Sequence, residues 1–486
     1  MNRTLILLFW LVAFTARAQQ AAYLDFDVQQ PAEPNGGLKA LNQFVAVNVR
    51  KPFMAQVANI KGMVILQGVV EPDGRIADVS VIRSLRPDCD REALRVFALF
   101  NAWKPAQKDG KAVRQVVTIP VPFRFNEPVA FENGVLTRYY DKNLQPVVSP
   151  NLAVLRSEVS TDSLGLPTGN LLFYKRNGDF WREEVEILFF RSQIPKRLTP
   201  AGPLFSIGHT EANEQPFDRV YFVDNKGDVY NEYHYDLNRN QILKIDRDNY
   251  GVVTNRVELV NDRYVTESWY GNGQIKQIVV TPNPRSMTKS FEFEQMLAYW
   301  DSTGNQTINE GNGQVLTKAR IQSLADTNLY TVLMEQGSYE KGVKTGRWIG
   351  KRVDGSDWYE EFYDKGVFLK GRTTYVGRAD TLNYTIRDRQ PEFEGGIQRL
   401  GQFLVQNILY PAVAQKAGVQ GKVLVSFVVN TDGSLSDINM LKGIGFGCDK
   451  EALRVVRAMN GRWKPGIQRG RPVRVKYSLP INFALN

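Results

Sequence analysis

One stretch of sequence occurs twice in this chain, and this duplication constrains the fold more than any other feature. The second occurrence, from Gly447 to Pro465, reads GCDKEALRVVRAMNGRWKP, and the first, from Asp88 to Pro105, reads DCDREALRVFALFNAWKP. Solenoid proteins repeat every roughly 20 to 50 residues, and these two occurrences lie much farther apart. We therefore expect two copies of one small domain with a different region between them.

The two copies match along their length. Each has a Gly-Gly pair near its start and a Pro-x-x-Phe pattern at its end, and we place them at residues 26–126 and 387–486. The matching pairs include Phe44 with Phe403, Asn48 with Asn407, Pro52 with Pro411, Gly62 with Gly421, and Trp103 with Trp463. The first copy is degenerate, because Lys51 stands where the second copy has Tyr410.

The apolar pattern of the second copy predicts an α+β domain of order α-β-β-α-β. Apolar residues recur at helical spacing over 396–408 and 449–459, and they alternate as in strands over 421–430, 435–441 and 473–479. A right-handed crossover over the second helix places the first strand between the other two. The third strand then lies at an edge of the sheet, parallel to the second.

Cys448 admits a structural and a chemical interpretation. Asp449 is a good N-cap for the helix that follows, and Cys448 and Leu453 then have the spacing of a hydrophobic staple. The cysteine is a small apolar plug in that interpretation, and a thiol activated by the helix N-terminus in the other. Only one further cysteine, Cys89, is present, and it lies at the equivalent position of the first copy, so no disulfide forms within either domain.

The region between the copies, residues 127–386, differs in composition. Aromatic residues precede Gly, Asn and Asp at many places, which predicts successive antiparallel β-hairpins. The run from Gly337 to Gly342, followed by Gly346-Arg347-Trp348, resembles MORN-like repeats of the YwqK type. The aromatic residues are either the packed face of a long sheet or the lining of a ligand-binding groove.

The start of the chain indicates export. Residues 1–18 contain a short basic start, an apolar run from Leu5 to Thr15 and an Ala-x-Ala site, which together are typical of a cleaved signal peptide. The alternative is an uncleaved segment that anchors the chain in the inner membrane. The formal net charge is +10, with 61 basic and 51 acidic residues. We expect a periplasmic protein without a nucleic-acid partner.

The sequence offers little for catalysis. Only two histidines, His209 and His234, are present, and two distant cysteines do not make an ordinary zinc site. Asp236 begins a stretch like a calcium loop, but Gln241 and Arg247 replace the required Gly and Glu. We therefore expect no enzyme activity, no metal and no cofactor, and we expect the basic residues near the C-terminus to form a solvated face or to meet acidic partners.

The second copy resembles the C-terminal domain of TonB, in the form common in Bacteroidetes-type sequences. The motifs are PEFEGG at 391–396, YP at 410–411, GVQGKV at 418–423, WKP at 463–465 and PVRVKYSLPINF at 472–483, together with the duplicated stretch. The resemblance implies that the last strand pairs with the TonB box, a short peptide of TonB-dependent outer-membrane receptors. The residues that it implies for partner binding are Tyr410, Pro411, Val473, Arg474, Val475, Lys476, Tyr477 and Ser478.

Two hypotheses of function follow. In the first, the chain is a periplasmic TonB-like energy transducer component that binds receptor peptides by β-strand addition in transport across the outer membrane. In the second, it is a soluble envelope scaffold whose TonB-like and MORN-like modules bind other envelope proteins without energising them. The first hypothesis predicts that Val475→Pro abolishes capture of TonB-box peptides.

Overall fold

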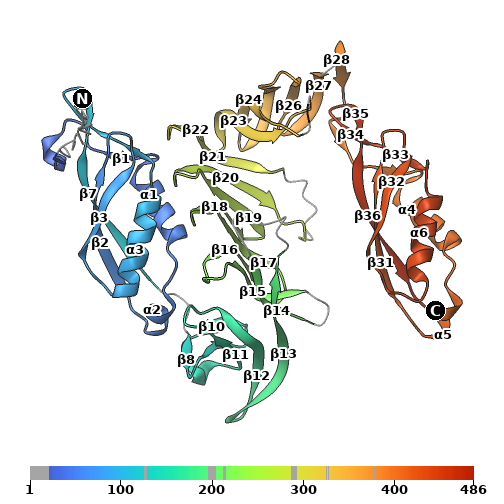
Figure 1. Ribbon diagram of the computed structural model, residues 1–486, viewed down its shortest axis with the longest axis horizontal. Coiled ribbons are helices and arrows are strands. Elements are labelled where there is room, and N and C mark those ends of the chain that lie inside the picture. Colours follow the sequence, from blue (N-terminus) through green and yellow to red (C-terminus); the bar gives the residue numbers. More distant parts are fainter. Residues whose placement is uncertain are drawn as a thin grey trace, which may run out of the picture. The chain divides into compact units, whose positions relative to one another are not determined.

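The chain divides into two compact units, Met1–Asn309 and Glu310–Asn486. The computed structural model describes residues 21–124, 129–194, 204–211, 215–285, 293–324, 326, 328–375 and 378–485 (Figure 1). The predicted signal peptide, residues 1–18, lies outside these described residues. The first unit contains the first copy and the strands that follow it, and the second unit contains further strands and the second copy.

The first copy is a three-stranded antiparallel sheet of order β3-β2-β7 covered by helices. Its main elements are α1 (Gly37–Asn48), α2 (Phe53–Val57), β2 (Gly62–Val70), β3 (Ile76–Arg83), α3 (Pro87–Leu99) and β7 (Gln115–Phe123). Short elements complete it: η1 (Asp25–Asp27), β1 (Glu33–Pro34), β4 (Trp103–Lys104), β5 (Ala106–Lys108) and β6 (Lys111–Val113). Helices α1 and α3 pack on the sheet through apolar residues that are fully buried, among them Leu41, Phe97 and Leu66.

The second copy repeats this arrangement, with the sheet order β32-β31-β36. Its main elements are α4 (Gly396–Asn407), α5 (Ala412–Lys416), β31 (Gly421–Val429), β32 (Leu435–Lys442), α6 (Cys448–Ala458) and β36 (Val475–Phe483). The short strands are β29 (Asp388–Arg389), β30 (Glu392–Phe393), β33 (Trp463–Lys464), β34 (Gly466–Gln468) and β35 (Arg471–Val473). Alternate residues of β31, Val423, Val425 and Phe427, are fully buried beneath α4 and α6, as their spacing predicts.

A large antiparallel sheet lies between the copies, as the aromatic hairpin pattern predicts. In the first unit its strands are β8 (Ala130–Glu132), β9 (Val135–Tyr140), β10 (Pro146–Val147), β11 (Leu155–Thr161), β12 (Pro167–Asn177), β13 (Phe180–Gln193), β14 (Phe205–Thr210), β15 (Pro216–Val223), β16 (Val229–Tyr235), β17 (Gln241–Arg247), β18 (Val253–Val260), β19 (Arg263–Trp269), β20 (Ile275–Pro282), β21 (Gln295–Trp300) and β22 (Gln306–Asn309), with the short helix η2 (Pro150–Leu152). In the second unit they are β23 (Asn312–Gln322), β24 (Tyr330–Glu340), β25 (Val343–Arg352), β26 (Asp357–Asp364), β27 (Val367–Tyr375) and β28 (Arg378–Tyr384).

Glycine-bearing turns form a row along one end of the sheet in the first unit. Successive strands alternate in direction, so every second turn lies at the same end. The glycines of this turn row are Gly165, Gly227, Gly251, Gly273 and Gly304, and all have the positive φ that favours glycine. Four of the five turns begin with an aspartate whose Oδ1 accepts the amides two and four residues later: Asp162, Asp224, Asp248 and Asp301.

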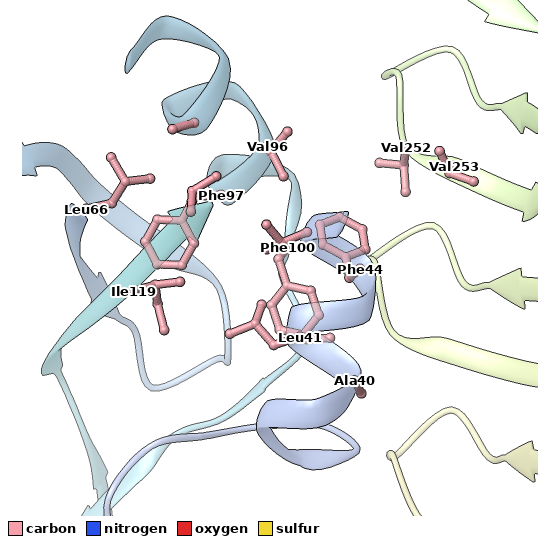
Figure 2. Packing of buried hydrophobic residues seen from close by; sticks show 14 of the residues in the cluster. Ala40, Leu41, Phe44, Leu66, Val96, Phe97, Phe100, Ile119, Val252 and Val253 are labelled. Carbon is pink, nitrogen blue, oxygen red and sulfur yellow. The ribbon is translucent and has the colours of Figure 1, made fainter. Parts of the chain in front are cut away.

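The first copy packs on this turn row. Phe44 of α1 and Phe100 lie against Gly273, and their rings belong to the same buried cluster as Val252 and Val253 (Figure 2). The polar contacts run along the same line: Asn48 Oδ1 accepts the amide of Val253 at 2.8 Å, Arg50 pairs with Asp228 at 3.1 Å, and Asn35 donates to Gln274 at 3.0 Å. The first copy and the sheet of the first unit therefore share one hydrophobic core.

The predicted N-cap of the second long helix is wrong by two residues. The N-cap is Gly447, whose φ of 90° suits glycine, and Cys448 is already helical. The Asp449 carboxylate points back along the chain and accepts the amides of Ile444 and Gly445, at 2.8 and 3.2 Å. The staple spacing is therefore also absent, because Cys448 does not precede the cap.

Both cysteines are free and fully buried, in the cores of their own domains. Burial raises the pKa of the Cys89 thiol to about 11, and it also raises the pKa of the Cys448 thiol. Neither thiol is therefore accessible or ionised near neutral pH, which favours the apolar plug over the activated nucleophile.

Candidate functional site

β36 forms an edge of the sheet in the second copy, with β31 as its neighbour. Pro480 is a residue of β36 and lies opposite Leu424 of β31. Because proline has no N–H, its nitrogen must face away from the ladder, toward the open edge. Orientation alternates along a strand, so the amides of Lys476, Ser478 and Asn482 face the same edge. Among the described residues, no segment pairs with this side of β36.

The equivalent edge of the first copy is closed by two means. Tyr23 forms a parallel bridge beside β7, in which its amide donates to Arg114 O and its carbonyl accepts the amide of Val116, both at 2.9 Å. Farther along the strand, Pro120 and Pro122 remove two of the outward donors. Pro122 corresponds to Asn482 in the second copy, where the donor is retained.

The position that corresponds to Tyr23 is used differently in the second copy. The alignment of the two copies puts Leu382 at this position, and Leu382 lies in β28 and pairs with Thr373 of β27. That part of the chain is therefore built into the large sheet and does not cover β36. The two copies thus share a fold, but only the second presents an open strand edge.

Side chains alternate along β36 as its sequence predicts. Lys476 and Ser478 are exposed, whereas Val475 and Tyr477 are partly buried on the opposite face. The ring of Tyr477 lies 5.0 Å from that of Trp463, which fixes the strand to the domain core. The exposed pair next to the free amides is polar and basic.

The predicted pairing segment, residues 473–478, is not one strand. Val473 belongs to β35 and pairs with Gly466 of β34 in a separate small hairpin. Arg474 stands between β35 and β36, and its guanidinium donates to Asn430 Oδ1 at 2.9 Å and reaches Asp437 at 3.3 Å. The open edge therefore begins at Val475 and continues to Phe483, five residues beyond the predicted segment.

Tyr410 and Pro411 lie at the far end of β36. The Tyr410 hydroxyl donates to Val419 O, and its ring meets the ring of Phe483 at 5.6 Å, while Pro411 is the N-cap of α5. A strand rises about 3.3 Å per residue, so Phe483 lies on the order of 17 Å along β36 from Ser478. The predicted binding residues therefore do not form one cluster.

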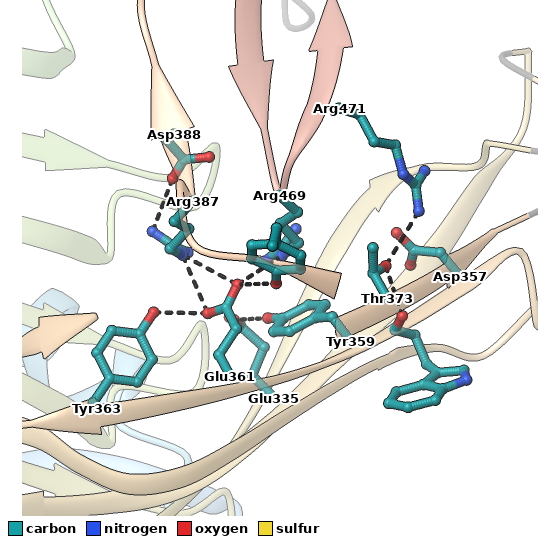
Figure 3. A network of polar contacts seen from close by, with 12 residues as sticks. Glu335, Asp357, Tyr359, Glu361, Tyr363, Thr373, Arg387, Asp388, Arg469 and Arg471 are labelled. Atoms are coloured by element: carbon teal, nitrogen blue, oxygen red, sulfur yellow. Dashed lines mark hydrogen bonds and ion pairs between the residues drawn. The ribbon is translucent and has the colours of Figure 1, made fainter. Parts of the chain in front are cut away.

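Sequence reasoning missed a buried charge cluster that joins the second copy to the sheet of its unit (Figure 3). Glu361 of β26, only 1% exposed, accepts from Arg387 at 3.1 Å and from Arg469 at 3.1 Å. The hydroxyls of Tyr363 and Tyr384 also donate to it, at 2.7 and 2.9 Å. Arg469 lies in the turn between β34 and β35, where we expected basic residues to form a solvated face or to meet acidic partners; Arg469 is not part of a solvated face, because it pairs with the buried Glu361 of its own chain.

The electrostatics of this cluster favour ionised Glu361. Burial alone raises its pKa, but the hydrogen bond from Tyr363 and the charges of Arg387 and Arg469 outweigh burial, and the pKa is lowered overall. The guanidinium of Arg469 also lies over the ring of Tyr359 at 3.5 Å. No local sequence signal could have revealed the contact between Arg469 and Glu361, since these residues are 108 positions apart in the chain.

Other candidate chemistry is accounted for by structure. The Asp236 carboxylate accepts the amides of Asn238 and Asn240 in a hairpin turn, at 2.9 and 2.7 Å. Over the described ranges, no group of His, Cys, Asp and Glu is arranged to hold a metal ion. A separate search of those ranges finds no helix with the length and apolarity that a membrane crossing requires.

Comparison with known proteins finds that one family model matches two regions of the chain. Residues 49–126 and 406–485 each match the family model described as Gram-negative bacterial TonB protein C-terminal. Two solution structures of the Helicobacter pylori TonB C-terminal domain are similar at 28% identity; they cover 18% of this chain, and the match spans 91% and 80% of their own chains, with a TM-score of 0.16 for each. No curated protein matches the chain.

Proposed function

We propose that the second copy binds an extended peptide of a TonB-dependent outer-membrane receptor by β-strand addition to β36. The family match at both ends of the chain supports a TonB-like role in energy transduction at the cell envelope. The observation that carries the proposal is the open edge of β36, with outward amides at Lys476 and Ser478, in contrast to the covered edge of β7. The proposed activity is binding and not catalysis.

The energetics of strand addition suit a reversible contact. Each backbone hydrogen bond contributes about 0.5–1.5 kcal/mol net, so a few of them give modest affinity without side-chain recognition. Lys476 is exposed beside the edge and Arg474 precedes it, so acidic residues in the peptide are favoured through charge complementarity. The first copy, whose edge is closed, serves as a structural domain in this proposal.

The sharpest test uses Ser478→Pro in the full chain. This change removes one outward donor and leaves the ladder between β36 and β31 in place. Val475→Pro, the variant that the sequence suggested, is the wrong choice, because the alternation set by Pro480 turns the Val475 amide toward β31. A proline there would damage the domain itself.

Binding of a synthetic TonB-box peptide to the full chain is measured by titration calorimetry. We expect Ser478→Pro to weaken binding at least tenfold, and Ser478→Val, which keeps the amide, to leave it within about threefold. The free energy of unfolding of each variant shows that the domain is folded. Equal affinity of folded Ser478→Pro and the parent chain would refute strand addition at β36.

Export to the periplasm belongs to the same proposal. It rests on the signal-peptide pattern of residues 1–18 and on the envelope association of the TonB family. Mass spectrometry of the protein purified from cells should find a mature N-terminus at Gln19. An intact Met1 start would favour the inner-membrane anchor, and failure to bind any receptor peptide would favour the non-energised scaffold.

A further inference from the structure

The starting point is the docking face of α1 in the first copy. Phe44 packs on Gly273 of the turn row, Asn48 accepts the Val253 amide, and the Gln43 side chain donates to Glu267 of β19. This face, with Ala40 and the ring of Phe100, covers the ends of β18 to β20. The chain itself thus shows what the first helix of this domain binds: the turns of a β-sheet.

Helix α4 retains the central side chains of this face. Gln402, Phe403 and Asn407 correspond to Gln43, Phe44 and Asn48, residue for residue. Asn407 even repeats the bond of Asn48 to the carbonyl four residues earlier, at 2.8 Å against 3.0 Å. The three side chains that contact the sheet in the first copy are therefore also present on α4 of the second copy.

On this face of α4, Phe403 packs against Phe393 and Arg462 and is 8% exposed, whereas the polar side chains beside it remain open to solvent. Gln402 is exposed and Asn407 is partly exposed, whereas Asn48 is buried. A cavity of 490 Å³ lies along Phe403, and the polar side chains of its lining are Glu394, Gln398, Arg399, Gln402, Gln406, Asn407 and Arg462. We call it the α4 groove.

The α4 groove is more polar and more highly charged than the α1 face, with two arginines, Arg399 and Arg462, and one acidic residue, Glu394, in its lining. Arg399 replaces Ala40, Gln406 replaces Val47 and Arg462 replaces Ala102. The Arg462 guanidinium lies 5.1 Å from the centre of the Phe403 ring, so a cation borders the ring that corresponds to Phe44. Polar, charged contact surfaces suit partners that bind and dissociate, whereas the apolar α1 face belongs to a permanent core.

We propose that the α4 groove binds the β-hairpin turns of another protein, at the rim of a sheet whose turns carry an aspartate and a glycine. Glycine admits close approach to the Phe403 ring, as Gly273 does at Phe44. An amide of the turn donates to Asn407 Oδ1, as Val253 does to Asn48. The aspartate supplies the negative charge that Arg399 and Arg462 favour.

A second copy of this chain is a poorer occupant, because its own turn row of this kind is already covered by its first copy. The groove also shares no residue with β36, so the inference goes beyond the proposed function and stands apart from it.

The probe is a disulfide-cyclised hairpin peptide with the sequence of residues 243–258, in which Leu243 and Glu258 are a cross-strand pair and Asp248 begins the turn. Its binding to the full chain is measured by calorimetry. We expect saturable binding that Arg399→Glu weakens at least tenfold. The matched control is Arg457→Glu on α6, which makes the same charge change at an exposed position outside the groove and should leave affinity within about twofold.

Photo-crosslinking locates the contact. A benzophenone amino acid at Gln402 should capture the peptide, whereas one at Val405, which is 83% exposed but absent from the groove lining, should not. Absence of saturable binding, or equal binding by Arg399→Glu, overturns the proposal. Self-association of the chain that Arg399→Glu abolishes would make a second copy the occupant and would also overturn it. Ser478→Pro should leave binding of the hairpin peptide unchanged. The proposal for the α4 groove and the proposal for β36 can therefore be refuted separately.

Discussion

Phe44 and Phe403 occupy the same position of the duplicated domain but have different neighbours. The ring of Phe44 is fully buried between Phe100 and the turn row, at 5.2 Å from the Phe100 ring. Phe403 is 8% exposed and lies beneath Arg462. The same residue therefore closes a core in one copy and borders an open groove in the other, and the difference lies in the residues around it.

Gly273 tests how closely the turn row fits the first copy. Its φ is +88°, and a Cβ there would lie 2.8 Å from Phe44 Cε2. Gly178 has a φ of +63° with open space around it. We expect Gly178→Ala to lower the free energy of unfolding by about 1 kcal/mol through backbone strain alone.

Gly273→Ala combines that strain with a steric clash, so we expect a loss of about 3 kcal/mol. Urea denaturation of the full chain, followed by tryptophan fluorescence, measures both changes. Equal losses for the two variants would show that the first copy does not press on this turn.

At the scale of elements, the hairpin of β34 and β35 attaches the second copy to β26. Arg469 at its tip reaches Glu361, and Arg471 donates to Thr373 Oγ1 at 3.2 Å. The equivalent hairpin of the first copy, β5 with β6, carries Asp109 in place of Arg469 and bonds instead to Gln29 at 2.9 Å. The turn residue thus distinguishes the two hairpins. With Arg469, the β34–β35 hairpin contacts the large sheet, and with Asp109, the β5–β6 hairpin contacts its own domain.

Low pH should weaken the contact between Glu361 and the arginines of the second copy. The folded pKa of Glu361 is lowered, so its contribution to stability is present above the unfolded pKa of about 4.3 and is lost as the pH falls through the folded value. We expect the free energy of unfolding of the second unit to decrease below about pH 4. Glu361→Gln should lower it by about 3 kcal/mol near neutral pH and flatten this pH dependence.

The matched control is Glu340→Gln, an exposed carboxylate of the same sheet, which should change stability by less than about 0.5 kcal/mol. Denaturant unfolding at several pH values between 3 and 7 measures all three chains. A Glu361→Gln variant with the parent pH dependence would show that this carboxylate does not titrate with folding.

At the scale of the whole molecule, sequence reasoning recovers what is local or repeated. The duplicated domain, its helices and strands and the antiparallel hairpins between the copies all leave periodic signals, such as Val423, Val425 and Phe427 in β31. Contacts between distant segments leave none: Tyr23 beside Val116, Arg469 with Glu361, and α1 against the turn row. The open edge of β36 was predicted as an element, but its start at Val475 and the distance of Tyr410 from Ser478 depend on tertiary packing.

The shared core of the first unit makes a prediction about cooperativity. Phe44, Phe100, Trp269 and Ile275 lie in one buried cluster, although they come from the first copy and from the large sheet. Removing the Phe44 ring creates a cavity at the point where these two parts meet, so both should lose protection together. Phe44→Ala should lower the free energy of unfolding by about 3–5 kcal/mol, whereas Phe26→Ala, at a position 82% exposed, should have little effect.

Hydrogen exchange followed by mass spectrometry shows where the protection is lost. In Phe44→Ala we expect faster exchange in α1 and also in β18 to β20, which lie more than 200 residues away in sequence, while amides of β31 in the second unit keep the parent rates. Faster exchange confined to α1 would mean that the first copy opens without the sheet. It would then be a domain attached to the turn row and not part of one cooperative unit with it.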